Sequence, residues 1–214
     1  MLFPRLDLYL VTDASLSNGR STLDMVTDAI RGGVTCVQLR EKNATAKDFL
    51  HTAQQLRPLL EKHRIPFIIN DRIDIALAAN ADGIHIGQSD IPLPDAKKIF
   101  PDKIIGITIH SAEQAVLAEK EGATYVAVSP VFDTPTKTDT PPGLGLEGVS
   151  RIRKSVSIPV VAIGGIQLNN AAEILQAGAD GLAVVSALVS APDISFAAKQ
   201  FTDLIQQVKY DSHS

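Results

Sequence analysis

Short apolar runs alternate with longer helical segments along the whole sequence of 214 residues, and this alternation constrains the fold more than any other feature. The apolar runs lie at residues 7–12, 34–40, 66–70, 83–86, 103–108, 124–129, 159–163 and 181–186. They are rich in Val and Ile, which favour strands. Because the runs are continuously apolar, they predict a parallel sheet with helices on its outer face and packed side chains on its inner face.

Glycine marks the end of several of the predicted helices. Gly33, Gly122 and Gly178 each stand shortly before the next apolar run. Since glycine accepts the left-handed backbone that ends a helix, the pattern indicates a βα unit repeated eight times. This repeat predicts an α/β protein with a single (βα)8 TIM barrel over residues 1–214 and a flexible tail at 209–214. An open, doubly wound parallel sheet is the alternative.

Two segments depart from the regular repeat. Pro58 lies in the second helical segment, where it is expected to kink or end the helix because proline lacks the backbone N–H. Residues 130–148 are dense in Thr, Pro and Gly. A connection of this length in a compact domain is usually functional or mobile, so this loop is a candidate part of a site.

The charge and the apolar pattern exclude several classes of protein. Twenty Lys and Arg against 24 Asp and Glu give a formal net charge of −4, which disfavours a basic nucleic-acid-binding module or a protein attracted to anionic lipid. No apolar run is long enough for a membrane span and the N-terminal residues lack a secretion signal, so a cytoplasmic location is expected. The single cysteine, Cys36, is expected to be a buried core residue.

Polar side chains close most of the predicted strands, where the active site of such a barrel lies. They include Gln38, Arg40, Lys42, Asn70, Asp71, Asp90, Thr108 and His110. Taken singly, Asp71 and Asp90 could cap the helices that follow them. Gln38 and Arg40 could likewise be solvated strand ends, and His85 a hydrogen-bonded core histidine. Because a closed barrel brings all strand ends into one ring, we expect these residues to share a cavity.

Two carboxylates on neighbouring strands predict a metal site. Asp71 and Asp90 offer the hard oxygen ligands that suit Mg²⁺, which also binds phosphate oxygens. Arg40, Lys42 and Lys137 offer positive charge for the rest of a phosphorylated ligand. The sequence therefore predicts a site for magnesium and a diphosphate.

A second anion site is predicted at the last two strands. Gly164-Gly165 and Val185-Ser186 expose backbone N–H groups where this kind of barrel often binds phosphate. The alternative is that the two glycines only make a tight turn. Thr134 and Thr136, in the long loop, could be ordinary loop residues or could belong to this site.

Five segments resemble the thiamine phosphate synthase family: Tyr9–Asp13, Val37–Lys42, Ile69–Asp71, Gly83–Asp90 and Pro159–Ile166. They follow the family's order and spacing over nearly the entire chain. The resemblance implies a transferase that joins the diphosphate of an aminopyrimidine, 4-amino-2-methyl-5-hydroxymethylpyrimidine, to a thiazole phosphate. The products would be thiamine phosphate and diphosphate, and the cofactor would be Mg²⁺.

The resemblance also implies which residues serve each part of the site. Those expected to bind the small-molecule substrates are Gln38, Arg40, Lys42, Asn70, Thr108, His110, Thr134, Thr136, Lys137, Gly165, Val185 and Ser186. Lys42, Thr108 and Lys137 are expected to be catalytic, and Asp71 with Asp90 would hold the metal. No nucleic-acid or membrane partner is expected, and a homo-oligomer is compatible with the sequence.

Two positions bear on the alternatives. Thr108 stands where the family commonly has serine, and we expect the change to be tolerated because the hydroxyl is kept. His110 favours a thiazole tautomerase, a related isomerase that uses a histidine there for proton transfer. A non-catalytic barrel that binds a phosphorylated ligand is a further alternative.

Overall fold

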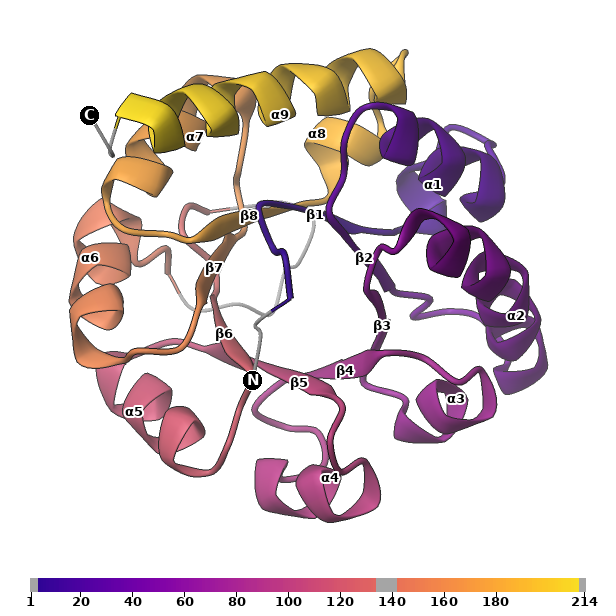
Figure 1. Ribbon diagram of the computed structural model, residues 1–214, viewed down its shortest axis with the longest axis horizontal. Coiled ribbons are helices and arrows are strands. Elements are labelled where there is room, and N and C mark those ends of the chain that lie inside the picture. Colours follow the sequence, from indigo (N-terminus) through magenta and orange to yellow (C-terminus); the bar gives the residue numbers. More distant parts are fainter. Residues whose placement is uncertain (1–3, 134–141, 212–214) are drawn as a thin grey trace.

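The computed structural model describes residues 4–133 and 142–211. Its strands form one closed barrel in which every neighbouring pair is parallel and β8 returns to pair with β1 (Figure 1). The strands are β1 (Leu8–Val11), β2 (Cys36–Leu39), β3 (Phe67–Asn70), β4 (Gly83–Ile86), β5 (Ile104–Ile109), β6 (Tyr125–Val128), β7 (Val160–Ile163) and β8 (Gly181–Val184). The predicted (βα)8 barrel is confirmed, and the alternative of an open sheet is wrong.

Helices surround the barrel, each on the outer side of the strands it connects (Figure 1). They are η1 (Ala14–Leu16, a 3-10 turn), α1 (Thr22–Arg31), α2 (Ala46–His63), α3 (Ile73–Ala78), α4 (Leu93–Ile99), α5 (Ala112–Lys120), α6 (Gly145–Ser155), α7 (Leu168–Gln176), α8 (Ser186–Val189) and α9 (Ile194–Asp211). Hydroxyl caps begin several of them: the side chains of Ser21, Thr45 and Ser111 accept backbone N–H bonds from the first turn. None of the helices in the described parts of the chain has the length and apolar character needed to cross a bilayer.

Of the two effects expected of Pro58, a kink or the end of its helix, the second is wrong. Helix α2 continues through Pro58 to His63 and ends at Arg64, whose φ of +56° is left-handed. The helix buries Phe49 and Leu60 on the two sides of the proline. Packing of this face against the barrel therefore offsets the hydrogen bond that proline removes.

The predicted tail at residues 209–214 is also partly wrong. Helix α9 extends to Asp211, and residues 212–214 lie outside the described residues. Lys209 explains the extension, because its Nζ forms an ion pair with Asp7 and donates to the backbone oxygen of Asp180 at 2.9 Å. These contacts tie the last turn of α9 to the segment before β1.

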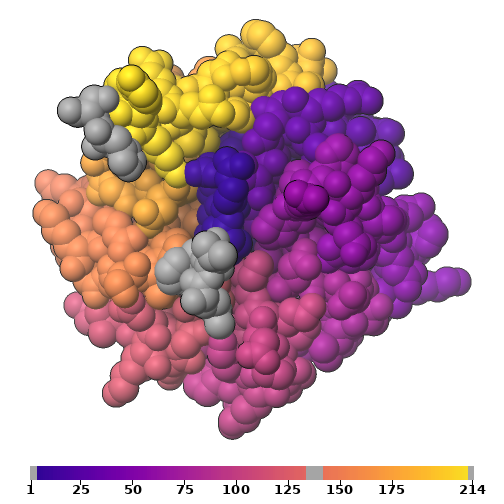
Figure 2. All heavy atoms as spheres, in the orientation of Figure 1, coloured from indigo at the N-terminus to yellow at the C-terminus, as the bar shows by residue number. Residues whose placement is uncertain are grey.

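Side chains inside the barrel form a cluster separate from the larger core between strands and helices. The inner cluster includes Tyr9, Cys36 and Tyr125, so the expectation that Cys36 is buried is confirmed. Leu6 joins the same cluster from the segment before β1, which lies across the middle of the barrel's amino end (Figure 2). The amino end is thus covered, which leaves the carboxyl ends of the strands for a cavity.

Candidate active site

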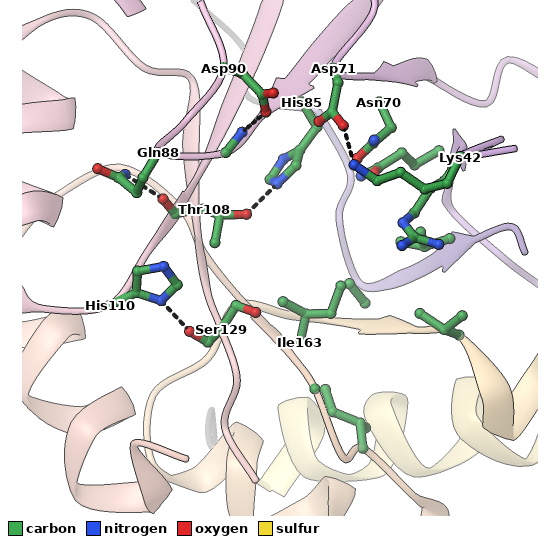
Figure 3. A pocket seen from close by; sticks show the side chains of 18 of the residues that line it. Lys42, Asn70, Asp71, His85, Gln88, Asp90, Thr108, His110, Ser129 and Ile163 are labelled. Atoms are coloured by element: carbon green, nitrogen blue, oxygen red, sulfur yellow. Dashed lines mark hydrogen bonds and ion pairs between the residues drawn. The ribbon is translucent and has the colours of Figure 1, made fainter. Parts of the chain in front are cut away.

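A cavity of about 410 Å³ lies at the carboxyl ends of the strands (Figure 3). Every strand or the loop after it contributes to the lining, from Val11 at the end of β1 to Ser186 after β8. The predicted site residues that line it are Gln38, Arg40, Lys42, Asn70, Asp71, Asp90, Thr108, His110, Gly165, Val185 and Ser186. Thr134, Thr136 and Lys137 lie outside the described residues.

The two carboxylates predicted to hold metal face the same cavity (Figure 3). Asp71 has a left-handed backbone, with φ of +59°, and does not cap α3, whose N-cap is Arg72. Asp90 does not cap α4 either, because its Oδ2 accepts the backbone N–H of Gly87 at 2.6 Å. The interpretation of both as helix caps is therefore wrong.

The two carboxyl groups differ in acidity because their surroundings differ. Burial raises the pKa of Asp71, but hydrogen bonds from Lys42 and Asp90 outweigh burial and hold that pKa below its ordinary value. Burial likewise raises the pKa of Asp90, and the adjacent Asp71 raises it further against the lowering effect of the Gly87 N–H. A single region thus holds one carboxyl that ionises readily and one that ionises less readily.

The two cations after β2 are each paired with a carboxylate. Lys42 Nζ lies 2.6 Å from Asp71 Oδ2, at the mouth of the cavity. Arg40 Nη1 lies 2.8 Å from Asp13 Oδ2, and both side chains of this pair are largely buried. Asp13 in turn caps η1 through the backbone N–H of Ser15. Arg40 is therefore held in place and is not a solvated strand end.

The glycines after β7 have backbone conformations that disfavour other residues. Gly164 has φ of +97° and Gly165 has φ of +67°. A Cβ on Gly165 would lie 2.7 Å from Phe132 Cβ, which is too close for any real contact. The Asn170 side chain also donates to the Gly165 oxygen at 3.0 Å, which fixes the orientation of that peptide group. The turn needs glycine, and it faces the same cavity as Val185 and Ser186.

Comparison with known proteins identifies the family of this barrel. A family model described as thiamine monophosphate synthase matches residues 8–188. The chain belongs to this family. The thiamine-phosphate synthase of Syntrophomonas wolfei is 51% identical over 198 residues, covering 92% of this chain and 95% of that protein. The thiamine-phosphate synthase of Albidiferax ferrireducens is 50% identical over 204 residues, covering 95% and 93%.

A solved structure agrees with the family match. The thiamine phosphate pyrophosphorylase of Pyrococcus furiosus superposes with a TM-score of 0.89 at 40% identity, over 96% of this chain and 98% of that one. The resemblance stated from the sequence is therefore confirmed for both family and fold.

The interior of this thiamine monophosphate synthase barrel contains polar contacts that the sequence analysis missed. Gln38 is 4% exposed and donates from Nε2 to the hydroxyl of Tyr9 at 2.9 Å. The Tyr9 hydroxyl is bonded to the Tyr125 hydroxyl, and that hydroxyl to His85 Nδ1, each at 2.9 Å. His85 Nε2 is bonded to Thr108 Oγ1, also at 2.9 Å. His85 is hydrogen-bonded as expected, but it also lines the cavity.

A signal for this arrangement was present in the sequence as a glycine inside a predicted strand. A Cβ on Gly106 of β5 would lie 2.0 Å from Tyr125 Cζ. Glycine in a strand interior often marks the close approach of another group, here an aromatic ring. The identity of that group depends on how the strands are staggered around the barrel.

His110 and Gln88 complete the far side of the cavity (Figure 3). His110 Nδ1 lies 2.5 Å from the backbone oxygen of Ser129, which can only accept, so Nδ1 carries the proton. In the neutral form of the ring, the Nε2 atom of His110 therefore has the lone pair. Gln88 Nε2 donates to the backbone oxygen of Thr108 at 2.6 Å and was not among the predicted site residues.

Proposed function

We propose that this chain is a thiamine phosphate synthase. It joins the aminopyrimidine diphosphate to a thiazole phosphate and releases diphosphate. The observation that carries the proposal is the meeting of Asp71, Asp90 and Lys42 in one cavity whose opposite wall is the glycine turn after β7. The first group suits a diphosphate with its metal ion, and the turn suits the phosphate of the second substrate.

The donor set at Asp71 and Asp90 fits Mg²⁺. This ion is usually held by one or two carboxylates together with substrate phosphates and water. Within the described residues, no group of three or more His, Cys, Asp or Glu side chains gathers in the manner of a cage built from protein ligands alone. When bound, magnesium supplies stabilisation of the negative charge on the diphosphate.

The residues on the diphosphate side stabilise the leaving group. The bond from the methylene carbon to the diphosphate oxygen breaks, and its electron pair leaves with the diphosphate. Lys42 and Arg40 place positive charge where that negative charge develops, and Lys137 stays a prediction for the same role. The Thr108 hydroxyl supplies a hydrogen-bond donor there. Because the aminopyrimidine ring is electron-rich, it shares the positive charge left on the methylene carbon.

The other residues orient the two substrates and exclude water. Gln38, with Asn70, holds the ring of the pyrimidine, while the backbone N–H groups at Gly165 and Ser186 hold the thiazole phosphate. The lone pair of the thiazole nitrogen forms the new bond to the methylene carbon. No protein nucleophile is required, so alignment is the main contribution of these residues. Thr134 and Thr136 stay predictions for the thiazole phosphate, as do a cytoplasmic location and a homo-oligomer.

The proposal is tested by mixing the purified protein with both substrates and measuring diphosphate release, with magnesium and with a chelator. We expect release that requires both substrates and stops in the chelator. No release in the presence of magnesium would contradict the proposal.

His110 favours a second candidate, a thiazole tautomerase, because its Nε2 lone pair is available to move a proton. A tautomerase would keep its activity in the chelator and lose it in the His110→Gln variant. A non-catalytic phosphate-binding barrel would show neither diphosphate release nor tautomerisation.

A further inference from the structure

An unbroken chain of hydrogen bonds runs through the barrel interior beneath the cavity. Its members are Gln38, Tyr9, Tyr125, His85 and Thr108, and each of the four links is 2.9 Å long. The two ends line the cavity, Gln38 on the side of β2 and Thr108 on the side of β5. Figure 3 shows the last link, from His85 to Thr108. The chain therefore joins two parts of the site that do not contact each other directly.

Four of these five side chains are shielded from water, and Thr108 is half-buried. Tyr125 is 0% exposed, Tyr9 1%, Gln38 4% and His85 7%. Burial raises the pKa of both tyrosines well above its ordinary value, so both keep their protons. Each hydroxyl then has one proton to donate. A hydroxyl that accepts a hydrogen bond from one neighbour therefore donates to the other, so the donor of each bond depends on the donor of the bond before it.

The Gln38 amide sets the donor and the acceptor of every hydrogen bond in this series. Its Nε2 donates to Tyr9, and the single proton of Tyr9 then goes to Tyr125, because the Cys36 thiol that also interacts with Tyr9 is the weaker acceptor. By the same reasoning, in a neutral His85 ring, Nδ1 accepts the proton of Tyr125, and the ring proton resides on Nε2 and points to Thr108. The hydroxyl proton of Thr108 is then the terminal donor. If the Gln38 amide were reversed, every bond would reverse and Thr108 would donate inward to His85.

We propose that Tyr9, Tyr125 and His85 are positioning residues that couple the pyrimidine-ring subsite at Gln38 to the diphosphate subsite at Thr108. The inference rests on the proposed function. An anionic diphosphate needs a donor from Thr108, which only the first direction of the chain supplies. In that direction Gln38 keeps its carbonyl oxygen and one N–H for the ring, the pair of groups that complements the edge of an aminopyrimidine.

The packing around these hydrogen-bonded side chains holds them in this arrangement. The rings of His85 and Tyr125 are stacked with centroids 5.6 Å apart, and the Tyr9 ring meets Tyr125 edge-on at 6.0 Å. Gly106 leaves the space in which the Tyr125 ring lies against β5. The aromatic rings therefore have little freedom to turn their hydroxyl groups elsewhere.

Tyr125→Phe tests the coupling, because it removes one hydroxyl from the middle of the chain and keeps the ring. We expect kcat/KM for the pyrimidine diphosphate to fall about tenfold, mainly through kcat, as Thr108 loses its fixed orientation. Ile68→Val is the matched control, since Ile68 belongs to the same inner cluster but offers no polar group. The control should keep its kcat, and an unchanged kcat in Tyr125→Phe would overturn the proposal. Tyr9→Phe provides a second break if Tyr125→Phe does not fold, and the same outcomes apply.

A double-mutant cycle separates coupling from a general effect on packing. Thr108→Val removes the hydroxyl at the end of this series of hydrogen bonds. If Tyr125 acts through Thr108, the double variant Tyr125→Phe/Thr108→Val should match Thr108→Val alone within about twofold. Losses that multiply would mean that Tyr125 acts independently of Thr108, and the proposal would be wrong.

The tautomer of His85 can be read without any turnover. Nitrogen NMR spectra of histidine-labelled protein, with inorganic diphosphate and magnesium added, should show the His85 proton on Nε2. The signals are assigned by their loss in His85→Gln. A proton on Nδ1 would overturn the direction proposed here. The two failures can be told apart. Absence of diphosphate release by the native protein would contradict the proposed function, whereas the position of the His85 proton tests the series of hydrogen bonds without any turnover.

Discussion

Lys42 Nζ and Asp71 Oδ2 lie 2.6 Å apart, so the cation proposed for the diphosphate and a carboxylate proposed for the metal form one ion pair. The pair joins the loop after β2 to the end of β3. It also lowers the pKa of Asp71 against the opposing effect of burial. A change at either residue is therefore expected to affect the other as well as the ligand.

Asp71→Asn should weaken magnesium binding while the fold is kept. The amide has nearly the same shape but no charge, so we expect diphosphate release to fall roughly 10- to 100-fold. Higher magnesium concentrations should restore part of the rate. The melting temperature should change little, because the Asp71 side chain caps no helix.

Asp74→Asn is the matched control for this variant. Asp74 lies three residues further along, is exposed, and pairs with Arg72 at the start of α3. Its replacement should leave the magnesium dependence of diphosphate release unchanged. Equal rates and equal magnesium dependence in both variants would contradict the metal role of Asp71.

Gly165→Ala should lower both stability and activity. The new Cβ would meet Phe132 Cβ at 2.7 Å, and alanine disfavours the φ of +67° at this position. We expect a loss of about 1–3 kcal/mol in the free energy of unfolding, measured by urea titration. The KM for the thiazole phosphate should rise, since the turn would move away from its position.

Gly145→Ala separates backbone strain from the clash. Gly145 has a similar φ of +63° but has no atom within 4 Å of the added Cβ. It should lose stability by the strain alone and keep the KM for the thiazole phosphate. If the two variants lost stability equally, with KM unchanged in both, the close packing at Gly165 would have no functional consequence.

The barrel could be predicted from the sequence because its strands are buried on both faces. Burial on both faces requires the continuous apolar runs, and the glycines before them mark the helix ends. The membership of the cavity followed from the fold, since polar residues such as Gln38 and Asp90 stand where strands end. Local propensity gave the wrong result at Pro58, where the packing of α2 outweighs the missing N–H.

The polar interior could not be predicted in the same way. Tyr9 and Tyr125 are 116 residues apart in the chain and meet only because of the stagger between strands around the barrel. The left-handed backbone of Asp71, which turns it from a cap into a cavity residue, also depends on tertiary contacts: its N–H donates to the His85 backbone oxygen at 2.8 Å. The loop residues Thr134, Thr136 and Lys137 stay predictions.

Asp13→Asn should disturb Arg40 without touching the cavity. Removal of one partner from this largely buried ion pair leaves Arg40 less firmly placed, and we expect a cost of about 1–3 kcal/mol in unfolding free energy. The KM for the pyrimidine diphosphate should rise severalfold, as steady-state kinetics can show. Asp28→Asn is the control, because the Asp28 pair with Arg31 is exposed. A normal KM in Asp13→Asn would mean that Arg40 does not need this partner to bind diphosphate.

Lys209→Met should change how stability depends on acid. Burial raises the pKa of Asp7, but Lys209 and Arg5 outweigh it and hold that pKa below its ordinary value of 3.8. A lowered pKa means that the Asp7 carboxylate stabilises the fold above pH 3.8, and that this contribution disappears as the pH falls through the lowered value. Without Lys209 the pKa of Asp7 rises, so the variant should be less stable than the native protein at neutral pH and should lose less stability than the native protein as the pH falls below about 4.

Urea unfolding of Lys209→Met from neutral pH down to about pH 3 measures this shift, and the loss at neutral pH should be about 1 kcal/mol. Lys199→Met is a control on the same helix, since Lys199 pairs with Asp203 in an exposed position. The control should follow the native pH profile. If Lys209→Met also followed the native profile, the contact between α9 and Asp7 would contribute nothing to stability, and the helical end of the chain would be held by its apolar face alone.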